Sequence, residues 1–227
     1  MSTTDSGTDR SGIRERSLAG WEVLSVISSA LIAEWMLVAV AGFPKLIVAV
    51  PVGLAFALMF LSHRARDESL RDIGFRFDNL LRAFAMLLPP LALLTILLLG
   101  VGYSSSSLNF FRWGSGSLVW KFSLALGWAL VQQYALQGFI NRRIAGLVGK
   151  NWVSVLLVAS VFAGLHLPNP WLTLLTFCGG AVSAAVYQRA PNLFALALSH
   201  AVVTWVAIST FPPKWLHHMR FGLKYFQ

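Results

Sequence analysis

Charged residues are scarce in this sequence, and acidic residues are confined to its first part. Only 12% of the 227 residues are charged, whereas soluble domains carry about 25%. All nine carboxylates lie at or before Asp78, so the chain from Asn79 to Gln227 contains none. The low charge argues against an ordinary soluble fold. The missing carboxylates leave most of the chain without the side chain that a Glu or Asp general base requires.

Cysteine is almost absent as well. Cys178 is the only one, which excludes an intrachain disulfide and leaves the redox compartment open. Basic residues, in contrast, outnumber acidic ones and give a net charge of +9. In an apolar chain such an excess is typical of cytoplasmic loops that meet anionic lipid, rather than of nucleic-acid binding. We therefore expect membrane lipid as a partner and no nucleic acid.

Long apolar runs are abundant, since 56% of the residues are hydrophobic. They predict an all-α, polytopic transmembrane helix bundle with about seven spans, the count ranging from about six to about eight. The bundle is expected to be one domain, residues 21–211, between a disordered cytoplasmic N-terminus, residues 1–20, and an interfacial tail, residues 212–227. The distribution of basic residues predicts an integral membrane protein with its N-terminus in the cytoplasm. The predicted spans are residues 21–41, 46–61, 83–101, 118–140, 152–167, 171–187 and 193–211.

Polar and ionisable side chains inside apolar runs are the candidate functional residues, because such groups are costly in hydrocarbon. His166 ends the fifth apolar run and His200 lies in the last one, so we expect the two to share a cavity. Gln132 and Gln133 lie in the fourth span. They are candidates for the same cavity or, alternatively, for hydrogen bonds that join neighbouring helices. Glu34 is the only carboxylate well inside a predicted span.

Three short motifs follow one another on separate apolar spans, over about residues 118–208. The first contains Gln132, Gln133 and Gln137, the second is Phe162-Ala-Gly-Leu-His166, and the third runs from His200 to Thr204. Their order and spacing resemble the CAAX protease and bacteriocin-processing family (CPBP or Abi) of intramembrane endopeptidases. The family pattern is Glu-Glu-x-x-x-Arg, then Phe-x-x-x-His, then His-x-x-x-Asn. The second motif is intact, whereas glutamines replace the charged residues of the first and Thr204 replaces the asparagine of the third.

The resemblance implies an endopeptidase fold in which a motif glutamate activates water and the histidines bind metal or stabilise an oxyanion. A carboxamide cannot accept a proton, so Gln132 and Gln133 do not supply a general base. A catalytic zinc site usually takes three protein ligands, and His166 and His200 provide two. Zinc or another divalent metal at these two histidines is therefore not favoured.

The leading hypothesis is a CAAX-protease-like integral membrane protein, located in a bacterial cell membrane, with altered or lost proteolytic chemistry. Its cavity is expected to bind a membrane or lipid-modified peptide or protein. One alternative is an active intramembrane protease that uses His166 and His200 with Glu34 as base. The other alternative is a transporter of a small solute or proton, although the sequence shows no broken-helix repeat of the kind found in many transporters.

Overall fold

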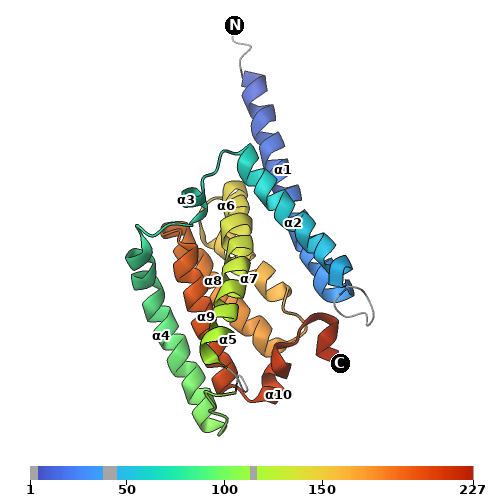
Figure 1. Ribbon diagram of the computed structural model, residues 1–227. Helices are drawn as coiled ribbons and strands as arrows, with labels where there is room; N and C mark the ends of the chain where they lie inside the picture. The colour runs from blue at the N-terminus through green and yellow to red at the C-terminus, as the bar shows by residue number, and fades with distance from the viewer. Residues whose placement is uncertain (1–4, 38–44, 113–116, 227) are drawn as a thin grey trace.

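The computed structural model describes residues 5–37, 45–112 and 117–226, and this part of the chain contains helices and no strand (Figure 1). Helices are expected in lipid because they satisfy the backbone hydrogen bonds within one segment. The predicted all-α fold is confirmed. The helices are α1 (Asp5–Leu31), η1 (Ile32–Leu37), α2 (Lys45–Ala65), α3 (Leu70–Ile73), α4 (Leu80–Ser104), α5 (Leu118–Gln133), η2 (Tyr134–Asn141), α6 (Arg142–Val148), α7 (Trp152–Gly164), α8 (Pro170–Arg189), α9 (Leu193–Thr210), α10 (Pro213–Leu216), η3 (His217–Met219) and η4 (Gly222–Phe226).

Four stretches of the described chain are long and apolar enough to cross a membrane, and they lie in α1–η1, α4, α8 and α9. Shorter apolar helices occur at Ala49–Ala65 and Trp152–Gly164. These helices confirm a helical membrane bundle. The count of about seven spans stays a prediction. The apolar part of α2, Ala49–Ala65, is shorter than each of the four long stretches, and so are α5 and α7.

The helices pack as a bundle with α1 and α2 along one side and α4 along the opposite side (Figure 1). Helix α9 packs against both α4 and α5, and α7 packs against α8. The core between them is apolar and includes Phe139 of η2, Val158 of α7 and Met59 of α2, each nearly inaccessible to solvent. This packing brings α5, α7 and α9, which carry the three motifs, around one interior space.

The expected disordered N-terminus, residues 1–20, and interfacial tail, residues 212–227, stay predictions. Helix α1 begins at Asp5. Once the apolar part of α1 is helical, extending the helix through a stretch without proline adds one hydrogen bond per residue. The structure shows how the C-terminal tail packs. The tail folds back onto the bundle, where Leu216 and Gly222 are buried.

The first motif contains a change of helix type. The α-helix α5 ends at Gln133 and continues as the π-helix η2. Short π-helical segments are rare in proteins, but those that occur often lie at functional sites. Gly138 lies in this wider turn, where an added Cβ atom would come within 3.0 Å of Ile73 and 3.2 Å of Tyr134. The glycine therefore lets η2 pack closely against α3.

Two buried asparagines set the starting points of α8 and α9. Asn192 accepts a hydrogen bond from the backbone of Ala195 at 2.9 Å, which caps α9, and its amide nitrogen donates to the carbonyl of Arg76 at 2.7 Å. Asn169 likewise caps α8 by accepting from the backbone of Leu172 at 3.1 Å. Each cap satisfies a backbone donor at a helix start that has no partner within the helix. Asn192 thereby ties α9, and with it the third motif, to the loop before α4.

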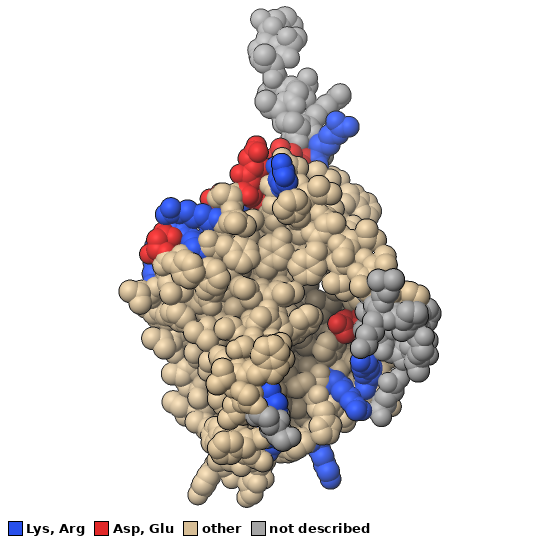
Figure 2. All heavy atoms as spheres, in the orientation of Figure 1, with Lys and Arg blue, Asp and Glu red and all other residues tan. Residues whose placement is uncertain are grey.

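A buried ionic cluster joins α1, α2 and α6 at the end of the bundle near α3. Glu68 accepts hydrogen bonds from Arg142 at 2.5 Å and from Arg143 at 2.8 Å, and its other contact is with His63 at 2.5 Å. Arg143 also lies 3.3 Å from Glu22 of α1. Figure 2 shows acidic and basic side chains together at this end of the molecule, above a broad belt of uncharged surface. The cluster therefore binds the α1–α2 pair to the helices that carry the motifs.

Candidate functional site

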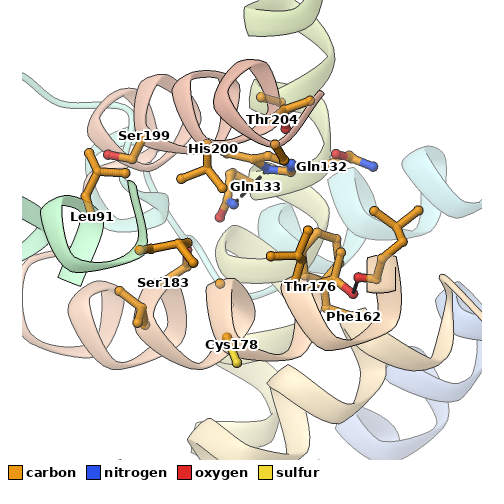
Figure 3. A pocket seen from close by; sticks show the side chains of 18 of the residues that line it. Leu91, Gln132, Gln133, Phe162, Thr176, Cys178, Ser183, Ser199, His200 and Thr204 are labelled. Carbon is orange, nitrogen blue, oxygen red and sulfur yellow. Dashed lines mark hydrogen bonds between the residues drawn. The ribbon is translucent and has the colours of Figure 1, made fainter. Parts of the chain in front are cut away.

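A cavity of about 600 Å³ lies among α4, α5, α7, α8, α9 and the tail (Figure 3). Its walls are mainly apolar, and polar side chains enter it from α5, from the turn after α7, and from α8 and α9. All the side chains that line it follow Asp78 in the chain, so none is a carboxylate. The polar side chains among the lining residues are Gln132, Gln133, His166, Thr176, Ser183, Ser199, His200 and Thr204.

Gln133 and His200 meet across the cavity from two neighbouring helices (Figure 3). The amide nitrogen of Gln133 lies 3.2 Å from Nδ1 of His200. An amide nitrogen can only donate, so Nδ1 of His200 accepts and the neutral ring carries its proton on Nε2. The amide oxygen of Gln133 is buried and has no hydrogen-bond partner among the described residues. A buried polar atom without a partner destabilises the folded protein by about 1–3 kcal/mol. Stability alone therefore does not explain the presence of Gln133.

His166 is held in the opposite tautomer. It lies in the turn after α7, and its Nδ1 is 2.7 Å from the carbonyl oxygen of Phe162. A carbonyl only accepts, so Nδ1 carries the proton and Nε2 of the neutral ring is an acceptor. The two histidines of the cavity therefore differ in kind. His200 offers a donor at Nε2 and His166 offers an acceptor.

The ring of Phe162 contacts both histidines. Its centroid is 4.9 Å from that of His166 and 5.8 Å from that of His200, and both contacts are edge-on. Phe221 of the tail lies on His166, with centroids 5.0 Å apart. Edge-on contacts at such distances are among the favourable arrangements of aromatic rings. The second motif thus supplies both a histidine and the aromatic wall that orients it.

Gln137 is separated from the cavity, although its neighbours along the helix line it. Its amide oxygen accepts from Asn141 at 2.7 Å, and Asn141 in turn accepts from Gln188 of α8 at 2.9 Å. Gln188 also donates to Ser154 of α7 at 2.9 Å. These bonds hold η2 to α7 and α8. Of the motif glutamines, Gln132 and Gln133 therefore face the cavity, and Gln137 acts as a link between helices.

The structure does not bring Glu34 to the cavity. Glu34 lies in η1 and is not among the described residues that line the cavity. Its backbone packs against Gly222 of the tail. The neighbouring Phe221 contacts His166 on the cavity side. Glu34 and His166 thus contact the same segment of the tail at adjacent residues.

The donor set fits a metal ion poorly. The described residues contain no group of three or more His, Cys, Asp or Glu side chains placed to share a metal. Nδ1 of His166 faces a carbonyl and Nδ1 of His200 faces an amide, so each histidine has only Nε2 left for a ligand bond. Two nitrogens are fewer than the three protein ligands of a usual catalytic zinc site.

Several lining residues were not identified from the sequence. Helix α4 contributes leucines such as Leu91 and Leu94, and the tail contributes Met219 and Phe221. The leucines of α4 have no feature that separates them from leucines that face lipid. The tail was interpreted as interfacial because of its aromatic and basic residues, and the same aromatic content is the only signal that pointed to Phe221.

The comparison with protein families decides how this cavity is classified. Residues 114–206 match the family model described as type II CAAX prenyl endopeptidase Rce1-like. Over this segment the chain is CAAX-protease-like, and its apolar helices are those of an integral membrane protein. The resemblance carried by the three motifs is thereby confirmed. No curated protein and no solved structure matched the chain.

The Rce1-like segment, residues 114–206, contains the motif residues that line the cavity, which are Gln132, Gln133, Phe162, His166, His200 and Thr204. Helix α4 and the tail lie outside this segment and supply the remaining walls. The cavity is therefore built from an Rce1-like centre and from surroundings that the family comparison does not cover.

Proposed function

We propose that the Rce1-like cavity binds a lipid-modified membrane peptide and that the family's hydrolytic chemistry is altered or lost. The observation that carries the proposal is the contact between Gln133 and His200 in a cavity without a carboxylate. The family resemblance places glutamates at Gln132 and Gln133. An amide cannot act as a general base toward water.

The two kinds of wall support a ligand with an apolar chain and a peptide group. Ligand sites of about 300–1,000 Å³ with mostly apolar walls and a few polar groups are typical for small molecules, and this cavity has a volume of about 600 Å³. The leucines of α4 suit a hydrocarbon chain. The donor on His200 and the acceptor on His166 suit the carbonyl oxygen and N–H of a peptide group. A prenylated peptide, the ligand class that the family's description indicates, combines both parts.

We further propose that the N-terminus and the ionic cluster of Glu68 lie on the cytoplasmic side of a bacterial cell membrane. Basic residues near this end include Arg64, Arg66 and Arg71, and an excess of Lys and Arg favours the cytoplasmic side. The bacterial location rests on the family resemblance.

The test is a pair of measurements in liposomes. A fluorescent peptide with an S-farnesyl cysteine is expected to bind the natural protein, and the same peptide without the farnesyl group is expected to bind much more weakly. Cleavage of the farnesyl peptide is expected to be absent in the natural protein. Equal binding of both peptides contradicts the proposed ligand. Cleavage that is lost in His166→Ala/His200→Ala contradicts the proposed loss of chemistry.

The variant Gln132→Glu/Gln133→Glu tests the same proposal from the other direction. It restores the carboxylates that the family pattern has at these positions. Cleavage by this variant, with none by the natural protein, supports a scaffold that differs from a protease mainly at these two residues.

A further inference from the structure

The tail of the protein, residues 213–226, forms a strap across one side of the cavity. It includes α10, η3 and η4, and it lies outside the Rce1-like segment. Trp215 of the strap stacks on Trp171 of α8 with centroids 4.9 Å apart. The backbone N–H of Gly222 donates to the carbonyl of Leu167 at 2.8 Å. The strap is thus attached to the turn that carries His166.

The middle of the strap has an unfavourable backbone. His217, His218 and Met219 have φ angles of 44°, 54° and 61°, and three consecutive residues other than glycine rarely adopt this left-handed conformation. Such a conformation persists only where the surrounding structure enforces it.

Asn169 provides that enforcement. Its amide nitrogen donates to the carbonyl of Leu216 at 2.8 Å and to the carbonyl of Arg220 at 3.0 Å. These two carbonyls immediately precede and follow the three left-handed residues. The same side chain caps α8 through its oxygen, and it is fully buried. One side chain therefore holds both ends of the strained segment and the helix beside the cavity.

The clamp places two strap residues in the cavity. Met219 and Phe221 line it, and the ring of Phe221 lies on His166. Together with the carbonyl and ring of Phe162, Phe221 leaves His166 little freedom to rotate. By contrast, Leu223 belongs to the same strap but is exposed and is not among the lining residues.

We infer that the strap completes the ligand site, with Phe221 as a positioning residue for His166 and Asn169 as the clamp that keeps Phe221 in place. The part of this inference that concerns ligand affinity rests on the proposed function. The shielding of His166 does not.

The first measurement is the reactivity of His166 toward diethyl pyrocarbonate, mapped by mass spectrometry in liposomes. His63, buried in the ionic cluster, serves as the internal reference. Removing the ring in Phe221→Ala is expected to raise the modification rate of His166 by about threefold or more, because local opening exposes a group that packing had covered. Phe221→Tyr keeps a ring and is expected to keep the natural rate, as is the matched control Leu223→Ala.

Asn169→Asp provides a second, independent variant. Aspartate retains the oxygen that caps α8, but it loses both hydrogen bonds to the strap. It is therefore expected to raise the reactivity of His166 while Phe221 itself is unchanged. Size-exclusion chromatography and a cooperative unfolding transition identify the variants that remain folded. An unchanged rate in both folded variants overturns the inference.

The second measurement is the affinity for the farnesyl peptide. Phe221→Ala and Asn169→Asp are expected to weaken binding, while Phe221→Tyr and Leu223→Ala are not. Increased reactivity of His166 with unchanged affinity would overturn the role of the strap in the ligand site. If the natural protein does not bind the peptide, the proposed function fails, and the reactivity of His166 still decides whether the strap positions that residue.

Discussion

The amide nitrogen of Gln133 lies 3.2 Å from Nδ1 of His200 and joins the end of α5 to α9. The family resemblance expects a glutamate at this position. A carboxylate would accept a hydrogen bond from the imidazole, whereas the amide nitrogen donates one to it. The substitution thus reverses the direction of the hydrogen bond as well as removing a base.

The tautomer of His200 tests this relationship. In the natural protein we expect the proton on Nε2, and in Gln133→Glu we expect it on Nδ1, because a carboxylate can only accept. The nitrogen chemical shifts of ¹⁵N-labelled histidine distinguish the two forms. Gln132→Glu brings the same charge to the cavity at the neighbouring position and is the control. A natural protein with the proton on Nδ1 would show that the amide is turned the other way.

Glu34→Gln tests the alternative in which Glu34 is the catalytic base. Because Glu34 is not among the described cavity residues, we expect this variant to match the natural protein in affinity for the farnesyl peptide. Any cleavage by the Gln132→Glu/Gln133→Glu variant is likewise expected to persist when Glu34→Gln is added. Loss of that cleavage in a folded protein would indicate that Glu34 takes part in catalysis.

Metal content tests the poor fit of the cavity to zinc. With two histidine nitrogens available, we expect far less than one zinc per chain in protein purified without chelators. Elemental analysis measures it. Near-stoichiometric zinc that disappears in His166→Ala/His200→Ala would contradict this expectation.

Glu68→Gln is expected to destabilise the protein strongly. Glu68 is largely buried and pairs with Arg142 and Arg143, and removing one partner of a buried ion pair costs about 3–5 kcal/mol. Unfolding in detergent micelles measures the loss. Asp67→Asn removes a charge from the adjacent exposed residue and is expected to have little effect. A loss of unfolding free energy below about 1 kcal/mol for Glu68→Gln would show that these ion pairs contribute as little as exposed surface pairs do.

The contribution of Glu68 is also expected to depend on pH. Burial by itself raises the pKa of Glu68, but hydrogen bonds from His63, Arg143 and Arg142 outweigh this effect and hold the pKa well below its usual range. A lowered pKa in the folded state stabilises the protein above the pKa of the unfolded state, about 4.3 for glutamate. The stability difference between natural protein and Glu68→Gln should therefore be constant from neutral pH down to this value. It should shrink as the pH falls further, toward the folded-state pKa. A difference that shrinks above pH 5 or so would contradict the lowered pKa.

The sequence alone determined the class of the fold and singled out four polar residues that line the cavity. The apolar runs predicted the helices, because hydrocarbon allows only segments that satisfy their own backbone hydrogen bonds. The same reasoning singled out His166 and His200, since polar groups in such runs are few and stand out. The motif spacing connected them to Gln132 and Gln133, and the structure places all four at one cavity.

Only the tertiary structure decided which polar residues face the cavity and what encloses them. Gln137 lies in a π-helix that no local sequence pattern predicted, and it does not line the cavity. Glu34 packs against the tail. The return of the tail depends on Asn169, which contacts residues about fifty positions away in the chain. Contacts of this kind arise from packing between distant segments. Hydropathy and spacing describe each helix separately and therefore do not contain them.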